Sequence, residues 1–203
     1  GRRRLYDTIA KFGFGRPTGI DLPSESAGIL RPVDRWTELE PAYVSFGQSL
    51  SVTALQLTNA FAAIANGGYL LRPYLVASPA ADGGGRRRVV ETPIAPSSVT
   101  QVRSMLESVV LAGTGRAAAI AGYRVAGKTG TSTAYRDAWF LGFTGQYVTG
   151  VWYGNDNFSP MGRVTGGSFP AQTWKTFMDA AYDGDNIPTA PGVDPHPRQI
   201  KER

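Results

Sequence analysis

The sequence predicts an α/β fold in which an antiparallel β-sheet is flanked by helices. Three segments rich in β-branched and aromatic residues follow one another closely, at 123–131, 138–144 and 147–155. The links between them are shorter than the crossover of about a dozen residues that parallel strands require, which favours antiparallel pairing. Segments with apolar residues at helical spacing precede and follow these strands.

Four segments carry apolar residues at helical spacing, and we expect these residues to form core. The second segment can be capped by Ser51 or Thr53 and stops at Gly67-Gly68. The third ends at Gly113, and the fourth begins near Pro170, because proline is favoured in the first turn of a helix. The apolar stripes are Leu5, Ile9 and Phe12; Leu57, Phe61 and Ile64; Val99, Val102, Leu106, Val109 and Val110; and Trp174, Phe177, Met178 and Tyr182.

Length and composition indicate one globular domain or a large part of one. The chain has 203 residues, of which 42% are hydrophobic and 18% charged. From 78 to 96 the composition shifts to Ala, Gly, Pro and Arg, which predicts an exposed loop or a loose hairpin closed by Val89-Val90. Beyond Asp183 prolines stand among polar residues, so we expect a domain over 1–183 and a disordered tail over 184–203.

The net charge of +5 owes much to two arginine triplets, Arg2 to Arg4 and Arg86 to Arg88. Such runs usually form a solvated face, although contact with anionic lipid or cell-wall polymer stays open. No aromatic residues are interleaved with the triplets, which argues against nucleic acid as a partner.

Residue usage also argues against metal or cofactor chemistry. The chain has no cysteine, and its one histidine, His196, lies in the proline-rich tail. No cofactor is therefore expected. No stretch approaches the roughly 18 consecutive apolar residues of a membrane helix, so we expect any anchor or export signal to lie outside this chain.

The segment from Val125 to Ser132 holds the strongest candidates for catalytic and substrate-binding residues. It is an apolar strand that ends in a cation, a glycine and clustered hydroxyl groups. At Gly130 a substrate backbone can approach the strand edge and pair with it as an added strand. Lys128 and the hydroxyls of Thr129 and Thr131 can hold an anionic group, and a backbone N–H just past the glycine can serve as an oxyanion donor. These are parts of an acyl-transfer site.

Other candidate residues have a structural interpretation beside the functional one. Arg136 and Asp137 could line the rim of a site or form a solvated turn pair. Gly166-Gly167-Ser168 could shape a loop over the site or open a helix with Ser168 or Thr165 as its cap. In the aromatic pairs Trp139-Phe140 and Trp152-Tyr153, one member should face the core and the other the opposite face.

The Lys-Thr-Gly tripeptide alone is weak evidence, because an arbitrary tripeptide occurs by chance in roughly a few per cent of chains of this length. Its context is more specific. From Leu5 to about Tyr182 the chain resembles the penicillin-binding transpeptidases, a family that uses a Lys-Thr-Gly element. The segments that carry the resemblance are KFGFGRPTGIDLPSESAG at 11–28, FGQSLSVTALQLTNAFAAIANGG at 46–68, GKTGTS at 127–132, RDAWFLGFTG at 136–145 and GVWYGNDNFSPM at 150–161. The last two, with VTGGSFPAQTWKTFM at 164–178, look most like class A enzymes, which join a glycosyltransferase to the transpeptidase.

The resemblance implies that residues 1–183 are the C-terminal part of a transpeptidase domain with the penicillin-recognising fold, and it implies a role for each residue of the motif. Lys128, Thr129 and Gly130 match the third active-site motif, on the strand that edges the cleft. The backbone N–H of Thr131 matches an oxyanion donor. The hydroxyls of Thr129 and Thr131 match those that bind the carboxylate of a terminal D-alanine or of a β-lactam, and Ser132 is counted with them as a substrate-binding residue.

The family's nucleophilic serine and lysine base lie in Ser-x-x-Lys, and a Ser-x-Asn motif supplies a second proton-handling group. Neither pattern occurs in the 203 residues. In the family both motifs precede the segment matched by residues 5–28, so we expect them on an upstream part that is also a partner of this chain. The chain alone should not form an acyl-enzyme.

The activity that the resemblance implies for the intact protein is cross-linking of peptidoglycan stem peptides by serine acyl transfer, on the extracytoplasmic face of a bacterial membrane. Stem peptides, β-lactams and other cell-wall synthesis proteins are the expected partners. Two alternatives stay open: a β-lactam sensor or inactive scaffold of the same fold, and a serine β-lactamase. The long class A-like strands and C-terminal segments argue against the lactamase.

Overall fold

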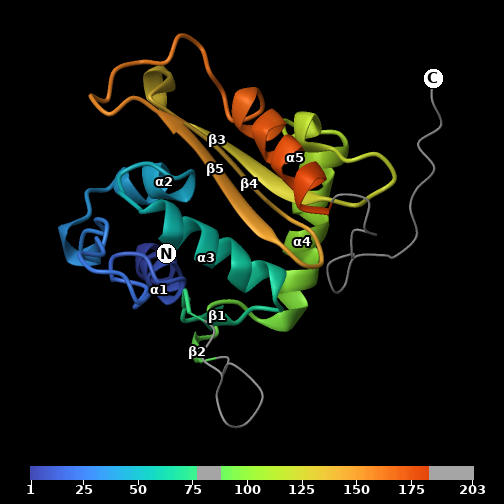
Figure 1. Cartoon of the computed structure of the whole chain (residues 1–203). Helices are drawn as coiled ribbons and strands as arrows, with labels where there is room; N and C mark the ends of the chain where they lie inside the picture. The colour runs from blue at the N-terminus through green and yellow to red at the C-terminus, as the bar shows by residue number, and fades with distance from the viewer. Residues whose placement is uncertain (77–87, 183–203) are drawn as a thin grey trace. The chain divides into compact units, whose positions relative to one another are not determined.

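A computed structural model describes residues 1–76 and 88–182 of the chain. The chain forms two compact units, residues 1–95 and residues from 96 onward. In the first unit the elements are α1 (Arg2–Lys11), η1 (Val33–Arg35), α2 (Glu40–Ser45), α3 (Ala54–Ala65), β1 (Leu70–Leu71) and β2 (Val89–Glu91) (Figure 1). In the second they are α4 (Pro96–Leu111), η2 (Arg116–Ala118), β3 (Ala126–Thr131), η3 (Thr133–Tyr135), β4 (Asp137–Phe143), β5 (Val148–Gly154) and α5 (Phe169–Tyr182).

The helix predicted at the start of the chain is α1, and its apolar face packs as expected. Leu5 and Ile9 lie against a small buried cluster of Val33, Trp36 and Val44. The arginines at 2–4 are exposed, and Arg3 pairs with Asp7 at 3.2 Å. The predicted solvated face of the first arginine triplet is therefore confirmed.

Helix α3 begins at a capping box. Thr53 Oγ1 accepts the N–H of Gln56 at 3.0 Å, and Gln56 Oε1 accepts the N–H of Thr53 at 2.9 Å. Thr53 rather than Ser51 is the cap. The buried Gln56 also donates through Nε2 to the carbonyls of Arg16 and Ala27, at 2.8 and 2.9 Å. One side chain thus starts the helix and holds the preceding loop against it.

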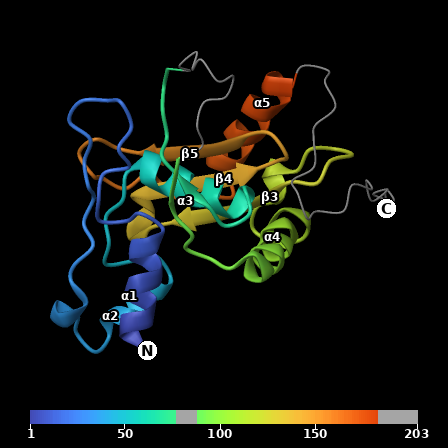
Figure 2. The ribbon, with the colours of Figure 1, turned by 90° about the horizontal axis from the view of Figure 1, so that it is seen from below.

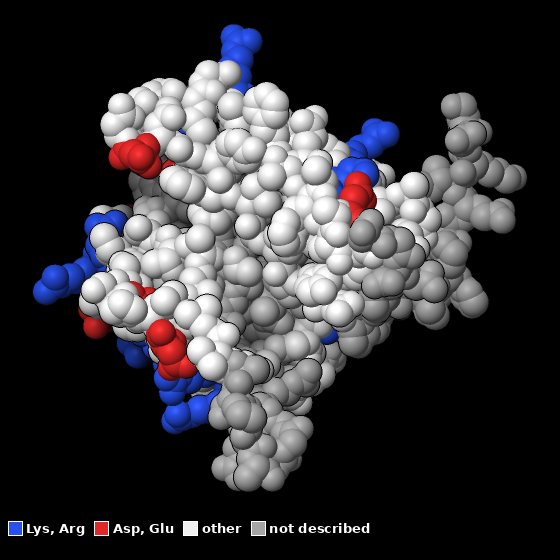
Figure 3. Space-filling view, viewed as in Figure 1, with Lys and Arg blue, Asp and Glu red and all other residues white. Residues whose placement is uncertain are grey.

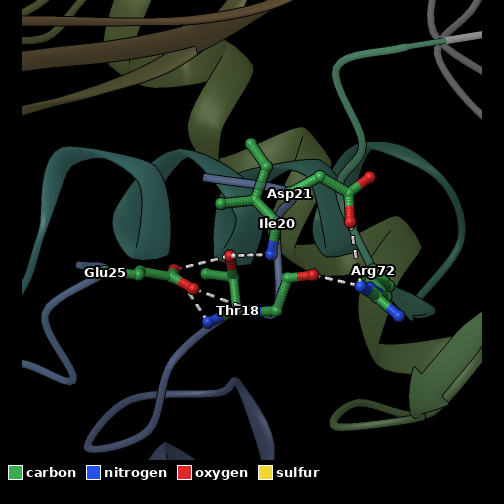
Figure 4. Close-up of polar contacts among 6 residues, drawn as sticks. Thr18, Ile20, Asp21, Glu25 and Arg72 are labelled. Atoms are coloured by element: carbon green, nitrogen blue, oxygen red, sulfur yellow. Dashed lines mark hydrogen bonds and ion pairs between the residues drawn. The ribbon is translucent and has the colours of Figure 1, made fainter. Parts of the chain in front are cut away.

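The loop from Thr18 to Glu25 closes on its own carboxylate (Figure 4). Glu25 Oε1 accepts from the backbone N–H and the hydroxyl of Thr18, at 2.8 and 2.6 Å, and Oε2 accepts from the N–H of Gly19 at 3.0 Å. Partial burial acts to raise the pKa of Glu25, but these three hydrogen bonds favour the charged form and the net shift is downward. Arg72 holds the other side of the loop through Gly19 O at 2.6 Å and Asp21 Oδ1 at 3.1 Å.

Strands β1 and β2 pair antiparallel, with Leu70 opposite Glu91. This is the loose hairpin that the sequence predicts around Val89-Val90. Residues 78–87 of the predicted exposed loop, Arg86 among them, lie outside the described residues. The predicted tail over 184–203 also lies outside them.

The second unit contains a three-stranded antiparallel sheet with the order β3-β4-β5. Gly130 pairs with Trp139, which pairs with Trp152. The strand predicted from Tyr123 begins only at Ala126, because the residues before it form a turn in which Tyr123 N–H donates to Ile120 O at 3.1 Å. The antiparallel pairing predicted from the short links is confirmed.

Helix α5 lies across one face of this sheet, and α4 runs beside β3 (Figures 1 and 2). Trp174 is fully buried, packs edge-on against Phe140 at 5.4 Å between ring centroids, and donates from Nε1 to Thr149 O at 3.1 Å. Tyr182 ends the helix in a hydrogen bond with Thr144, and burial raises the pKa of its phenol. The other buried members of this core are Val110, Ala118, Ile120, Val125, Ala171 and Met178.

The aromatic pairs follow the alternation of a strand only in part. Phe140 is fully buried and Trp139 half-buried, as expected. Trp152 and Tyr153 are both exposed, at 45% and 36%, so the core interpretation is wrong for that pair. Strand β5 is the last strand of the sheet, and its side chains therefore have a neighbouring strand on one side only.

On the face shown in Figure 3, the Lys and Arg side chains stand singly or in small groups. Within residues 1–76 and 88–182, no helix is both long enough and apolar enough to cross a membrane.

Candidate active site

The Lys-Thr-Gly motif lies on β3, at the edge of the sheet. Within the part of the chain that the structure describes, β4 is the strand that pairs with it. An ion pair between Arg124 and the buried Glu107 of α4 fixes the chain just before the strand starts. Because an edge strand keeps half of its backbone groups unpaired, β3 can accept a further extended chain.

The direction of the backbone groups along β3 follows from its pairing. Ser132 donates its N–H to Asp137 O at 2.9 Å, just beyond the last ladder pair. In an antiparallel ladder, residues whose N–H and C=O face the partner alternate with residues whose groups face away. The backbone groups of Thr129 and Thr131 therefore face the outer edge of the sheet. The N–H proposed from sequence as an oxyanion donor is on that side.

Lys128 and Thr131 present exposed side chains beside this edge. The Lys128 ammonium donates to Thr129 O at 2.8 Å, so it lies against the strand's own backbone. Thr131 Oγ1 accepts the N–H of Gly166 at 3.1 Å. Side chains alternate along a strand, so the two project from opposite faces of the sheet.

The hydroxyls of Thr129 and Thr131 have different partners, although the sequence predicts the same role for both. The Thr129 hydroxyl lies 2.6 Å from the hydroxyl of Thr114, in the turn after α4. One of the two hydroxyls donates to the other, so Thr129 is already engaged within the protein. Thr114 is a neighbour of the motif that sequence reasoning missed, because 15 residues separate the two threonines.

Ser132 and Asp137 close the turn between β3 and β4. Ser132 Oγ accepts the N–H of Asp137 at 2.8 Å and donates to its Oδ2 at 3.0 Å. Asp137 Oδ1 accepts from Trp152 Nε1 at 3.1 Å. Asp137 thus lies at the turn, half-buried, and its carboxylate joins the turn to β5. Ser132, predicted to bind substrate, is a turn residue whose hydroxyl already has a partner.

The same turn holds two consecutive non-glycine residues with positive φ, Ala134 at 60° and Tyr135 at 56°. This conformation is uncommon for residues with a side chain. The turn is supported by the segment after β5, in which Met161 donates its N–H to Tyr135 O at 3.0 Å. Arg136 lies over the ring of Phe158, 4.7 Å from its centroid. Arg136 thus packs on an aromatic ring of that segment.

Behind the motif lie the paired glycines that precede α5. Gly166 is buried and packs on the backbone of Gly130, while Gly167 packs on Thr114. Ser168 and Thr165 form the turn that opens the helix, with Ser168 Oγ donating to Thr165 O at 2.7 Å. The segment opens α5, as one of the two interpretations expects, while its role as a loop over the site stays a prediction. The doubled glycine was the available signal for a close backbone approach.

The comparisons with known proteins agree with this arrangement. The profile of the penicillin-binding protein transpeptidase domain matches residues 1–177. This chain belongs to that family. It is 44% identical to stage V sporulation protein D of Bacillus subtilis over 148 residues, which cover 70% of the chain and 23% of that protein. It is 40% identical to peptidoglycan D,D-transpeptidase FtsI of Escherichia coli over 129 residues, which cover 63% of the chain and 21% of that protein.

The fold is that of solved penicillin-binding proteins. Penicillin-binding protein 3 of Mycobacterium tuberculosis, solved in complex with ampicillin, superposes with a TM-score of 0.70 at 29% identity, over 95% of this chain and 48% of that one. The predicted penicillin-recognising α/β fold is therefore confirmed. The chain spans less than a quarter of the length of the two curated relatives named above. The likeness to class A enzymes is not confirmed by these comparisons and stays a prediction.

Proposed function

We propose that this chain supplies the substrate-binding edge strand of a peptidoglycan D,D-transpeptidase. The observation that carries the proposal is the pairing of β3, whose outer edge carries the backbone groups of Thr129 and Thr131 beside the exposed Lys128 and Thr131 side chains. An acyl-donor stem peptide would add to this edge as a further antiparallel strand. Two relatives named for this chemistry support the assignment, FtsI and the ampicillin-binding protein above.

Lys128 and Thr131 would recognise the carboxylate of the terminal D-alanine. A charge-assisted hydrogen bond is about twice as strong as a neutral one, so a cation and a hydroxyl at the same edge favour a carboxylate over an amide or ester. The N–H of Thr131 faces the same edge and would donate to the oxyanion of the tetrahedral intermediate. Thr129 would contribute mainly through its backbone, because its hydroxyl contacts Thr114.

The nucleophile would be a serine outside these 203 residues, since Ser-x-x-Lys does not occur among them. Its oxygen attacks the carbonyl of the penultimate residue, the C–N bond to the terminal D-alanine breaks, and D-alanine leaves with a proton on its amine. An acceptor amine of a second stem peptide then attacks the ester and restores the serine hydroxyl. A β-lactam would follow the first half of this course. These steps would take place on the extracytoplasmic side of the membrane, with other cell-wall synthesis proteins as partners.

Labelling of the intact protein by a fluorescent penicillin tests this function. In Lys128→Ala the second-order rate constant of acylation should fall by about tenfold to a few hundredfold, because a hydrogen bond to a charged group contributes about 1.5 to 3 kcal/mol. Folding should change little, because Lys128 is exposed. Lys175→Ala is the matched control, since it removes an exposed cation on α5 that pairs with Asp179.

The isolated 203-residue chain should not be labelled. A covalent adduct on one of its residues would contradict the placement of the nucleophile. Equal acylation of the Lys128→Ala variant and the wild type would remove β3 from the active site. Labelling without D-alanine release from a stem-peptide substrate would favour a β-lactam sensor, and rapid hydrolysis of the label would favour a β-lactamase.

A further inference from the structure

We propose that Gly166 is a positioning residue for the Thr131 hydroxyl, an inference that rests on the function proposed above. Its backbone N–H donates to Thr131 Oγ1 at 3.1 Å from a buried position behind the strand. Thr131 itself is exposed at the strand edge. The contact therefore joins a buried donor to the hydroxyl of an exposed residue.

Gly166 is required at this position because nothing larger fits. A Cβ there would lie 2.6 Å from the carbonyl oxygen and 2.8 Å from the nitrogen of Gly130, and it would overlap the carbonyl oxygen of Trp139. The φ of Gly166 lies outside the left-handed region, so alanine is excluded by contact and not by backbone strain. The neighbouring Gly167 is constrained in a similar way, because a Cβ there would overlap the carbonyl oxygen of Thr114.

The hydrogen bond from Gly166 decides what the Thr131 hydroxyl can do. A hydroxyl has one hydrogen and two lone pairs, and the N–H of Gly166 occupies one lone pair. The remaining hydrogen is then free to be donated outward, and the bond that the oxygen accepts polarises it into a stronger donor. A donated hydrogen bond is stronger to an ionised carboxylate than to a neutral ester, so this arrangement favours a carboxylate at the strand edge. The Thr129 hydroxyl instead contacts the hydroxyl of Thr114 at 2.6 Å, and either of the two can be the donor.

Substitution of Gly166 should lower the selectivity for a substrate with a free carboxylate. A substitution that only destabilised the fold would lower acylation by both substrates alike. The intact protein is acylated with a penicillin bearing a free carboxylate and with the methyl ester of the same penicillin, and the ratio of the two rate constants is the selectivity. Thr131→Val should lower this ratio by about tenfold to a hundredfold, since it deletes a hydrogen bond to a charged group. Gly166→Ala should lower it comparably and affect the ester far less. Thr131→Ser should keep the selectivity of the wild type.

The double variant Gly166→Ala/Thr131→Val isolates the coupling. If Gly166 acts through the hydroxyl, its substitution should not lower the selectivity further once Thr131 is valine. Gly162→Ala is the control. Gly162 lies in the same segment and has a positive φ of 57°, and a Cβ added there would have no neighbouring atom within 4 Å. This variant reports the effect of destabilising the segment without contact to β3, and its selectivity should equal that of the wild type.

Three results would overturn the inference. The first is unchanged selectivity in Gly166→Ala, and the second is an equal fall in its acylation rate constants for the free penicillin and the methyl ester. The third is a double variant in which the selectivity losses of the two single variants add. If Gly166→Ala does not fold, as judged by circular dichroism, Gly167→Ala displaces the same segment through Thr114. The selectivity ratio is then measured for Gly167→Ala and for the double variant Gly167→Ala/Thr131→Val. A wild type that no penicillin acylates would refute the proposed function itself. A wild type that is acylated but shows no coupling would refute this inference alone.

Discussion

Glu25→Gln should destabilise the first unit by about 1 to 2 kcal/mol at neutral pH. The carboxylate accepts three hydrogen bonds in the Thr18–Glu25 loop, two on Oε1 and one on Oε2. The glutamine carbonyl can keep the two from Thr18, but its NH2 group would face the N–H of Gly19, donor against donor. One lost hydrogen bond to a charged group contributes up to about 3 kcal/mol, and partial exposure reduces this figure. Urea denaturation followed by circular dichroism measures the change.

The pH dependence separates charge from shape. The folded-state pKa of Glu25 lies below its ordinary value of 4.5, so its stabilisation is present above that pH and is lost as pH falls through the folded-state pKa. The difference in unfolding free energy between wild type and Glu25→Gln should therefore be constant from pH 7 to about 5 and shrink below pH 4.5. Glu38→Gln, at an exposed glutamate of the same unit, is the matched control. A difference that persists unchanged at pH 3 would refute the carboxylate's role in the loop.

Two further predictions concern the second unit. Tyr182→Phe should cost about 1 to 2 kcal/mol of unfolding free energy, because it removes the partner of the buried Thr144 hydroxyl. Adding Thr144→Val should recover most of that loss. A double variant whose loss of stability equals the sum of the two single losses would contradict this. Glu107→Gln should cost about 3 kcal/mol, since it removes the carboxylate from an ion pair in which the Glu107 side chain is 7% exposed and that of Arg124 14%. Asp179→Asn, which breaks an exposed pair on α5, should cost less than about 0.5 kcal/mol, and equal losses in the two variants by urea denaturation would show that burial does not matter here.

Sequence periodicity predicted most of the fold because each element buries a face with its own period. The stripes of α1 and α4 could be read without knowing their partners, and short links forced the three strands to pair antiparallel. In α3 the predicted core stripe is wrong, because the buried residues are Gln56, Ala60 and Ala63, and in α5 the predicted core residue Phe177 is 55% exposed. The pair Trp152-Tyr153 was misjudged because alternation gives the two faces of a strand but not what covers each face. Both residues lie on the last strand of the sheet, and both are exposed.

The motif on β3 could also be predicted from the sequence, but the residues that pack against it could not. Lys128, Thr129, Gly130 and Thr131 are adjacent in sequence, and their residue types alone suggested carboxylate recognition. Thr114 and Gly166 reach the strand through tertiary packing, at separations of 15 and 35 residues. No local pattern encodes such contacts, so the difference between the two threonine hydroxyls became visible only in the folded chain.

That difference follows from the geometry of the strand itself. Thr129 and Thr131 are two residues apart, so both side chains project from the face on which Gly166 and Gly167 pack. A hydroxyl on that face finds a partner inside the protein, whether it is Thr114 or the N–H of Gly166. Thr131 keeps access to the edge because it is the last residue of β3 and is exposed. The N–H of Gly166 can only donate, so it leaves the hydrogen of the Thr131 hydroxyl available, whereas the Thr129 hydroxyl shares a hydrogen bond with Thr114 in which either can be the donor. Packing on one face of the strand thus fixes the donors that its edge offers to substrate, and this preorganisation is what makes recognition at an edge strand selective.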